Sequence, residues 1–239
     1  MTVARLAPPW YVHPAAAPQD WTWLAARHRD VSFAVVNVHN GPGSEDDAYY
    51  PDAMARLAGL RTLGYVAVDY GKRPVAAVVR EIALWQKLYR IGGIMLDELP
   101  TSAQTLDRCA EYAAAARAAG VAFLTANPGV FPSPAHLELF DVTAVFEGTA
   151  QDYAGFEHPG WAREVPPSRL WHLVYDCAPE ETENICRTAA GRGAGHVFAT
   201  DRSLPNPWLG PPTAVSDQLL ADLNHLAVDA DGGLFDRSH

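Results

Sequence analysis

The chain has 239 residues, 49% of them hydrophobic and 19% charged, with a formal net charge of -10 at pH 7. This composition predicts a globular chain with a large core, and it argues against a nucleic-acid partner, because the 18 Lys and Arg residues form no cluster that could neutralise a phosphate backbone. No stretch approaches the roughly 18 uninterrupted apolar residues of a membrane span, so we expect no membrane partner.

The N-terminus lacks the apolar core of a signal peptide, which predicts a cytoplasmic protein. A secreted protein whose signal segment had been removed would show the same sequence. The three cysteines, Cys109, Cys177 and Cys186, do not have the spacing of a metal site. Their odd number favours reduced thiols that pack in the interior.

Short β-rich apolar runs recur along the chain, and their starts lie roughly 20 to 30 residues apart, the length of one strand plus one helix. Each run is a predicted strand. In chain order, the eight runs cover 6–12, 32–38, 62–68, 92–98, 121–127, 142–148, 170–176 and 195–200.

Helical patterns lie between several of these runs. The clearest covers 74–90, where Val78, Ile82, Trp85 and Tyr89 fall on one face at spacings of four and three. This spacing predicts an amphipathic helix that packs its apolar face on the sheet.

A second helix is predicted over 102–120, with Ser102 as its N-cap and Gly120 as its C-terminal stop. Two more are predicted over 179–193 and 213–227. The segment between the sixth and seventh runs, 158–168, is rich in Pro and Gly and predicts a loop.

Eight apolar strands that alternate with helices predict an α/β fold, a (β/α)₈ TIM barrel with a parallel sheet covered on its outer face. An open doubly wound sheet is the alternative. That fold usually has a glycine-rich turn after its first strand, whereas residues 13–20 contain no glycine. Since no linker interrupts the pattern, we expect a single domain over 1–239, with a frayed tail from about residue 229.

In such a barrel, polar residues at the carboxyl ends of the strands face the active site. Nearly every predicted strand ends in a polar or titratable residue. In strand order, these residues are Tyr11 and His13; Asn37, His39 and Asn40; Asp69 and Tyr70; Asp97 and Glu98; Asn127; Glu147; Tyr175 and Asp176; Thr200 and Asp201.

The carboxylates at these strand ends predict acid–base chemistry at this end of the barrel. Asp97 and Glu98 are adjacent, so along an ideal strand one faces the mouth and the other faces the following loop. Their proximity favours one protonated carboxyl near neutral pH. Glu147 ends the sixth run, and glycoside hydrolysis commonly needs one protonated carboxyl and one carboxylate. For a single acid such as Asp69 or Asp176, a helix cap or an ion-pair partner is an equally good interpretation.

Aromatic residues at the strand ends fit two interpretations. They are either ordinary residues of the barrel rim or aromatic faces on which sugar rings stack. The residues concerned are Tyr11, Tyr70, Tyr175 and Trp208. No metal-binding motif, Walker loop or GxSxG elbow is present, so we expect neither a metal nor a cofactor.

Eight short motifs follow one another at these strand ends: "YVHP" (11–14), "NGPG" (40–43), "YGKRP" (70–74), "GIMLDE" (93–98), "NPG" (127–129), "FEG" (146–148), "HLVY" (172–175) and "TDRSLPNPW" (200–208). In this order they resemble the spherulin-4-like family, also called spherulation-specific family 4, over about residues 8–225. The resemblance implies a (β/α)₈ barrel. It also implies glycoside hydrolysis, because characterised fungal members cut polymers that contain N-acetylgalactosamine.

The resemblance places the family's acidic residues on Asp97, Glu98 and Glu147. The chain departs from the family at two rim positions, where His39 is inserted into "NVHNGPG" and Val68 replaces a common Thr. Fungal relatives are also secreted. These departures bear on the substrate rather than on the carboxylates.

We therefore expect an endo-acting glycoside hydrolase for an amino-sugar-containing poly- or oligosaccharide of the N-acetylgalactosamine or galactosamine type. Glu98 is the expected general acid/base, Glu147 the nucleophile or water-activating base, and Asp97 the residue that sets their protonation. These roles can be permuted, and an N-acetyl group of the substrate is an alternative nucleophile. The expected substrate-binding residues are Tyr11, Asn37, His39, Asp69, Tyr70, Asn127, Tyr175, Asp201, Asn206 and Trp208.

Two other functions fit the same pattern. One is a carbohydrate-binding barrel without turnover, and the other is a cytosolic enzyme that acts on a small metabolite. An open groove across the barrel mouth would favour a polymer, whereas a closed pocket would favour a metabolite. The sequence makes no prediction of oligomeric state, linkage or anomeric outcome.

Overall fold

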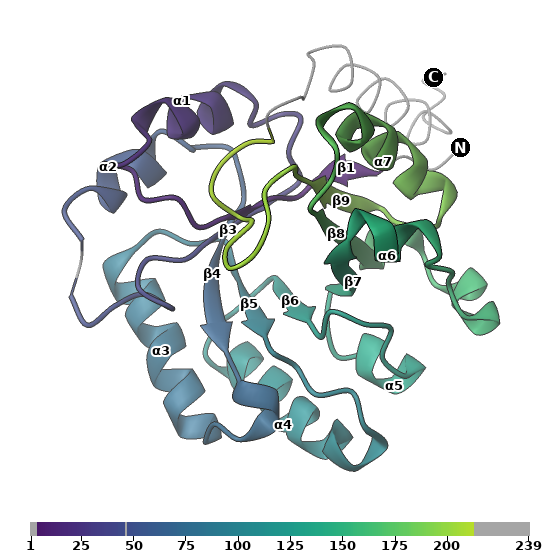
Figure 1. The fold of residues 1–239 in the computed structure, drawn as a ribbon. Coiled ribbons are helices and arrows are strands. Elements are labelled where there is room, and N and C mark those ends of the chain that lie inside the picture. Colours follow the sequence, from purple (N-terminus) through teal and green to yellow (C-terminus); the bar gives the residue numbers. More distant parts are fainter. Residues whose placement is uncertain (1–3, 46, 213–239) are drawn as a thin grey trace, which may run out of the picture.

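One parallel sheet organises the computed structural model, which describes residues 4–45 and 47–212 (Figure 1). The helix expected over 213–227 and the tail expected from about 229 lie outside the described residues. The strands are β1 (Arg5–Leu6), β2 (Pro9–Trp10), β3 (Ala34–Val36), β4 (Thr62–Ala67), β5 (Gly93–Asp97), β6 (Leu124–Asn127), β7 (Val142–Thr149), β8 (Leu170–Tyr175) and β9 (His196–Ala199).

The first two strands close the sheet into a barrel. β1 pairs with β9, whereas β2 pairs with β3, and every pair in the sheet is parallel. Pro8 and Pro9 lack the N–H groups that an uninterrupted strand would use, which accounts for the break between β1 and β2. Counted as one interrupted strand, they make the sheet eight-stranded. The predicted (β/α)₈ barrel is therefore confirmed, and the open doubly wound sheet is excluded.

Helices follow most of the strands and cover the barrel (Figure 1). The α-helices are α1 (Pro18–Ala26), α2 (Tyr50–Ala55), α3 (Val75–Leu88), α4 (Leu106–Ala118), α5 (Pro134–Leu137), α6 (Ala150–Ala154) and α7 (Pro179–Gly191). Short 3₁₀ helices are η1 (Asp69–Gly71), η2 (Ala103–Thr105), η3 (Gly160–Glu164) and η4 (Pro167–Arg169).

The strongest helix prediction, over 74–90, is confirmed by α3. Val78, Ile82, Trp85 and Tyr89 are all buried. Trp85 packs on the backbone of Gly64 in β4, where an added Cβ would lie 2.6 Å from the indole ring. The Trp85 indole N–H also donates to the Tyr65 carbonyl at 2.8 Å, so α3 is fixed to the strand it covers.

Two local predictions differ from the structure. Ser102 precedes the 3₁₀ helix η2 and makes no side-chain cap to it. The α-helix α4 begins only at Leu106, after Thr105. The expected loop over 158–168 contains η3 and η4, because its prolines favour tight turns without preventing a short helix. Gly120 ends the helical segment as expected, with a φ of 87°.

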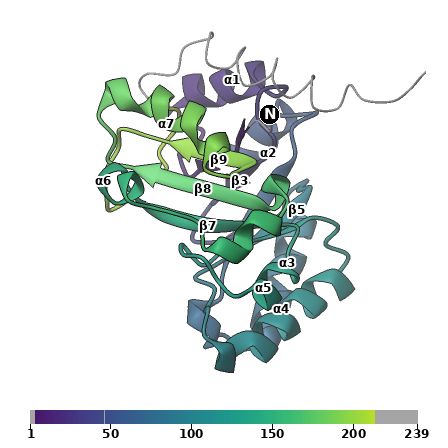
Figure 2. The same cartoon turned by 90° about the vertical axis from the view of Figure 1, so that its right-hand side faces the viewer.

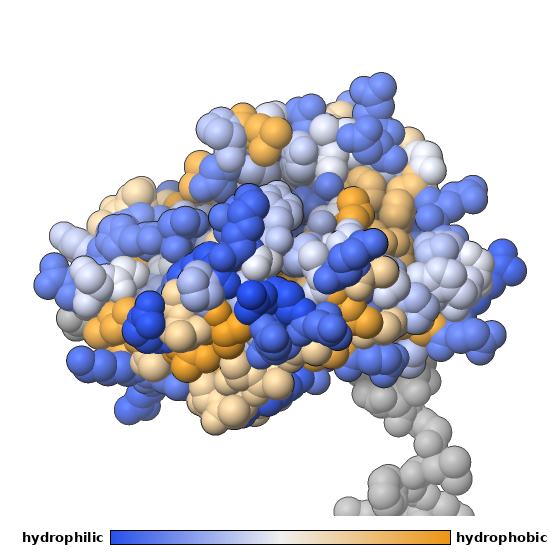
Figure 3. All heavy atoms as spheres, turned by 90° about the horizontal axis from the view of Figure 1, so that it is seen from below, coloured by the Kyte–Doolittle hydropathy of each residue, from blue (hydrophilic) through white to orange (hydrophobic). Residues whose placement is uncertain are grey.

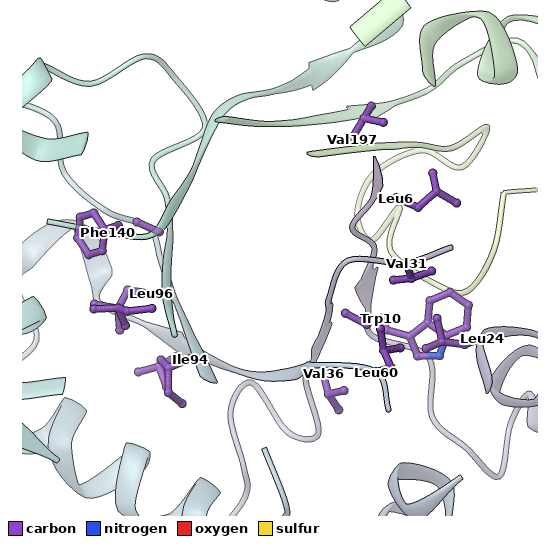
Figure 4. Close-up of a cluster of buried hydrophobic side chains, with 14 of the residues drawn as sticks. Leu6, Trp10, Leu24, Val31, Val36, Leu60, Ile94, Leu96, Phe140 and Val197 are labelled. Atoms are coloured by element: carbon purple, nitrogen blue, oxygen red, sulfur yellow. The ribbon is translucent and has the colours of Figure 1, made fainter. Parts of the chain in front are cut away.

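The buried side chains form two layers. Residues on the outward faces of the strands pack beneath the helices, and Figure 4 shows Leu6, Val36, Ile94, Leu96 and Val197 pointing away from the barrel interior. A separate cluster fills the interior: Ala7, Phe33, Val35, Leu63, Tyr65, Ala67, Met95, Val142, Ala144, Trp171, Leu173, Phe198 and Trp208. This alternation fixes which residue at each strand end faces the mouth.

The three cysteines are free and buried, as predicted. Seen from the side, β8 runs toward the end of the barrel where α6 lies (Figure 2). On the face shown in Figure 3, hydrophilic side chains cover most of the surface and hydrophobic ones form smaller patches among them. None of the described helices has the length and apolar character needed to cross a bilayer.

Candidate active site at the barrel mouth

Three neighbouring strands bring polar side chains to the mouth of the barrel. In β5, Asp97 follows Met95 by two residues and therefore shares its inward direction. Asp97 pairs in register with Asn127 at the end of β6. The two side chains thus stand side by side above the interior cluster.

A β-bulge turns Glu147 toward the same place. Val142 and Ala144 of β7 face the interior, so strict alternation would turn Phe146 inward and Glu147 outward. The register shifts between Ala144 and Phe146, which leaves Val145 as an extra residue. Beyond this bulge, Glu147 pairs with the inward-facing Leu173, and Phe146 joins the outer layer.

Asn127 connects the two acids. Its Nδ2 donates a hydrogen bond to Oε2 of Glu147, and its side chain also hydrogen-bonds Asp97. Its Oδ1 accepts the Gly129 N–H at 3.0 Å, and the Gly129 carbonyl accepts the Glu147 N–H at 2.9 Å. The amide is therefore held in one orientation, with its N–H groups directed at the carboxyl groups.

Burial raises the pKa of Glu147 to about 7. The hydrogen bond from Asn127 opposes this shift, and the nearby charge of Asp97 adds to it. A pKa near neutrality suits a group that first donates and then accepts a proton.

Burial also raises the pKa of Asp97, but several hydrogen bonds oppose the shift. They come from the Tyr65 hydroxyl, the Glu98 N–H and the Asn127 side chain. The charge of Glu98 raises the pKa further. Asp97 thus has more donors to its ionised form than Glu147, which makes it the better candidate for the carboxylate of the pair.

Glu98 lies beyond the end of β5 in a left-handed conformation, with a φ of 56°. Its N–H bonds the Asp97 carboxyl, and its carbonyl accepts the Tyr70 N–H at 2.9 Å. This turn takes the chain out of the strand immediately after Asp97. Of the expected acidic pair, Asp97 is the member that shares Asn127 with Glu147.

Aromatic side chains surround the acids. Tyr11 packs edge-on against Tyr65, with ring centroids 5.6 Å apart, and burial together with the charge of Asp97 raises its pKa. Tyr175 packs edge-on against Trp208 at 6.1 Å. The Trp208 carbonyl accepts the Tyr11 N–H at 2.9 Å, which ties the segment after β9 to the first strand; that segment crosses in front of the barrel in Figure 1.

Tyr65 is a site residue that the sequence did not reveal. It lies in the middle of β4, where an aromatic residue is an ordinary strand former. Burial, the charge of Asp97 and the hydrogen bond to Asp97 all raise the pKa of Tyr65, so it stays protonated as a donor. The sequence signal that could have found Tyr65 is strand alternation. Tyr65 lies two residues before Ala67, and both residues face the barrel interior.

Other expected binding residues have local partners. Asn37 Oδ1 accepts the Gly41 N–H at 2.8 Å, and Asn206 Oδ1 accepts the Trp208 N–H at 3.1 Å, so both shape their own loops. Asp69 pairs with Lys72 at 3.1 Å on the surface. Asp201 is half-buried in the segment after β9.

Two histidines and Tyr70 lie farther out on the rim. His39 is 62% exposed, and its Nε2 lies 3.9 Å from Asp47 Oδ2. His13 Nε2 lies 3.1 Å from the same oxygen. Tyr70 is 60% exposed.

Among residues 4–45 and 47–212, no three His, Cys, Asp or Glu side chains gather as metal ligands would. The mouth of the barrel thus holds two half-buried carboxyl groups that are joined by an amide and flanked by tyrosines. Such a pair can transfer a proton and stabilise a positive charge.

The profile of the spherulation-specific family 4 matches residues 5–220. A crystal structure of Aspergillus clavatus Sph3 in complex with GalNAc superposes with a TM-score of 0.74 and 23% identity, covering 95% of this chain and 98% of that one. A dihydrodipicolinate synthase from Bacteroides thetaiotaomicron reaches a TM-score of 0.50 at 13% identity, covering 82% of this chain and 69% of that one. The sequence matches no curated protein.

Proposed function

Because the chain belongs to the spherulation-specific family 4, we propose that it is a glycoside hydrolase that cleaves within a saccharide chain containing N-acetylgalactosamine or galactosamine. The sugar class is supported by the similarity to a structure that holds GalNAc. The proposal extends to a single barrel domain that performs the reaction with its own side chains and without a metal.

The link between Asp97 and Glu147 through Asn127 carries the proposal. Hydrolysis of a glycosidic bond needs one carboxyl that gives a proton to the leaving oxygen and a second that stays ionised. Burial raises the pKa of Glu147 to about 7, which suits the proton donor. The donors around Asp97 favour its ionised form, which suits the nucleophile.

In the first step, the Asp97 carboxylate attacks the anomeric carbon while Glu147 protonates the departing oxygen. In the second, Glu147 removes a proton from water, and the water releases the sugar from Asp97. This assignment permutes the one expected from the sequence, where Glu98 was the acid/base. Here Glu98 contributes its charge and its N–H to the environment of Asp97.

The shared amide also bears on stereochemistry. Two acceptors of one NH₂ group lie about 5 Å apart, which is near the carboxyl separation of retaining enzymes. We therefore infer retention of the anomeric configuration. Proton NMR of the first product formed distinguishes retention from inversion, and an inverted first product would contradict the assignment of Asp97 as nucleophile.

The aromatic residues supply the sugar-binding surfaces of the proposal. Tyr11 and Tyr175 lie near enough to Glu147 for its charge to raise their pKa, and Trp208 packs edge-on against Tyr175. Aromatic rings of this kind suit the C–H groups of a pyranose ring. Their hydroxyl and indole groups can bond the sugar's hydroxyl and acetamido groups.

Substitution of single carboxyl groups tests the proposal. With a partially deacetylated N-acetylgalactosamine polymer as substrate, Asp97→Asn and Glu147→Gln should each reduce reducing-end release at least about 1,000-fold. Glu98→Gln should reduce it less. Glu111→Gln, which removes a carboxylate from an exposed ion pair on α4, is the matched control and should leave the rate unchanged.

Two outcomes would overturn the proposal. Saccharide binding by the wild-type protein with no release of reducing ends would identify a carbohydrate-binding barrel. Full activity of either Asp97→Asn or Glu147→Gln would remove that residue from the mechanism.

A further inference from the structure

The loop after β4 is held in a strained conformation that presents an aromatic ring to solvent. Asp69 and Tyr70 have φ angles of 45° and 49°, and Gly71 follows at 86°. The left-handed region costs a non-glycine residue about 1 kcal/mol or more. Burial of the Tyr70 side chain does not offset that cost, because the residue is 60% exposed.

Strain of this kind is confined to one end of the barrel. Among the described residues, every non-glycine residue with a positive φ lies shortly after a strand, in the loops that form the mouth: Asn40, Asp69, Tyr70, Glu98 and Asp176. Backbone strain that surrounding contacts maintain tends to gather at functional sites. The Tyr70 turn therefore belongs with the candidate active site.

Hydrogen bonds join this turn directly to the backbone of the acids. The Tyr70 N–H donates to the Glu98 carbonyl at 2.9 Å, and the Val68 N–H donates to the Asp97 carbonyl at 2.9 Å. Two left-handed turns, one at Tyr70 and one at Glu98, thus support each other across neighbouring strand ends.

Charged groups flank the ring. Lys72 Nζ lies 5.9 Å from the centroid of the Tyr70 ring and 3.1 Å from Asp69 Oδ1. Gly71 packs toward the loop after β5, where an added Cβ would meet Pro100 at 3.3 Å. The Tyr70 ring thus forms a small aromatic surface on a loop that the contacts above hold in place. Lys72 and Asp69 lie beside it and can hydrogen-bond the hydroxyl groups of a sugar.

We propose that Tyr70 forms an outer sugar subsite, on which a second ring of the saccharide chain stacks while the bond beside Asp97 and Glu147 is cleaved. The inference rests on the proposed function and adds a chain-length requirement to it. A flat aromatic face beside polar groups suits the C–H face of a pyranose, whereas a protein partner would need a larger apolar surface. Cleavage should therefore favour oligosaccharides over single-sugar glycosides.

Binding to an inactive variant tests the subsite apart from catalysis. In the Glu147→Gln background, calorimetry would compare α-linked N-acetylgalactosamine oligomers of one to six sugars. Tyr70→Ala should weaken binding of the longer oligomers roughly tenfold and leave binding of the monosaccharide unchanged. Tyr70→Phe retains the ring and should bind as Tyr70 does.

Tyr70→Gly separates the subsite from a structural role. Glycine adopts the left-handed conformation without strain, so this variant should keep or raise the melting temperature while it loses the same affinity as Tyr70→Ala. Equal affinity of the parent and Tyr70→Ala for the longest oligomer would overturn the subsite, even if the protein cleaves saccharides. Binding that depends on Tyr70 in a protein without turnover would instead overturn the proposed hydrolysis and retain the subsite. Absence of oligomer binding to the parent would overturn both.

Discussion

Asp97 and Glu147 lie on β5 and β7, which are not adjacent in the sheet, and both hydrogen-bond the Asn127 side chain on the strand between them. The charge of Asp97 also raises the pKa of Glu147. The amide moderates that repulsion because it offers an N–H to each carboxyl. It therefore controls how readily the two acids ionise.

Replacement of Asn127 by Ala should raise the pKa of both acids, because their hydrogen bonds from Asn127 oppose the effect of burial. We expect kcat/KM to fall roughly 100-fold, and the alkaline limb of its pH profile to move upward. The measurement is the pH dependence of kcat/KM on an oligosaccharide substrate. An unchanged pH profile would show that Asn127 does not control the ionisation of the acids.

The pKa of Glu147 predicts the pH dependence of both activity and stability. A proton donor with a pKa of about 7 predicts that kcat/KM falls as the pH rises above about 7. Since the folded pKa exceeds the ordinary value of about 4.5, the associated stability is fully present below about pH 4.5 and is lost as the pH rises through about 7. The loss can reach about 3 kcal/mol, since one pKa unit corresponds to about 1.4 kcal/mol.

Urea unfolding of the wild type and Glu147→Gln at pH 4.5 and pH 8 measures this stability term. The variant should be the more stable protein at pH 8, and the difference should shrink at pH 4.5, where the wild-type carboxyl is protonated. Glu111→Gln is the control for a carboxylate whose ion pair is exposed. If the wild-type protein and Glu147→Gln responded to pH in the same way, the raised pKa would be contradicted.

The sequence predicted the barrel because apolar runs and helices alternate at a regular spacing, and that alternation also located the polar strand ends. It did not predict the bulge at Val145. In a short run of apolar residues, one extra residue does not change the hydrophobic pattern that identifies the strand. Without the bulge, strand alternation assigns Glu147 to the wrong face. The motif "FEG" led to Glu147 without revealing how its direction is set.

The choice between Asp97 and Glu98 lay beyond the sequence for a related reason. Adjacent residues face opposite sides of a strand, but only the inward position of Met95 identifies Asp97 as the inward acid. Tyr65 was missed because a buried tyrosine in a strand is indistinguishable from a core residue until its hydroxyl has a known partner. Asn37 and Asn206 were expected to bind substrate, but their side chains accept hydrogen bonds from their own loops.

A hydrogen-bonded histidine pair, formed by His172 of β8 and His158, predicts acid sensitivity. His172 Nδ1 lies 2.9 Å from the Tyr153 hydroxyl, and His172 Nε2 lies 3.0 Å from His158 Nε2. Burial, together with the smaller effects of the charges of His158 and Arg192, lowers the pKa of His172 to about 3. The stability from neutral His172 is therefore present above about pH 6.5 and is lost as the pH falls toward about 3.

His172→Phe keeps an aromatic ring but removes both hydrogen bonds. We expect this variant to lose about 1 to 3 kcal/mol of unfolding free energy at pH 7.5, because the Tyr153 hydroxyl and His158 Nε2 lose their partner. Its stability should then fall less steeply than that of the wild-type protein between pH 6.5 and pH 4. Urea unfolding across this range measures both effects, and parallel declines would contradict the role of His172.

Gly41 permits the "NGPG" loop to lie against a half-buried ion pair. Its φ is 134°, and an added Cβ would overlap Oε1 of Glu81, whose other oxygen pairs with Arg73. Glu81 Oε1 is itself buried without a hydrogen-bond partner, so the loop and the carboxylate are closely packed. Gly41→Ala should therefore strain the backbone and displace Glu81, with a loss of about 2 kcal/mol or more in unfolding free energy.

Gly160→Ala is the matched control for Gly41→Ala, since an added Cβ at Gly160 meets nothing within 4 Å. Urea unfolding of the two variants separates a general effect of alanine from the contact with Glu81. In a Glu81→Ala background, Gly41→Ala should cost less than it does in the wild type, because the overlap disappears while the strain at φ 134° remains. If Gly41→Ala and Gly160→Ala were equally stable, the close packing of the loop on Glu81 would be contradicted.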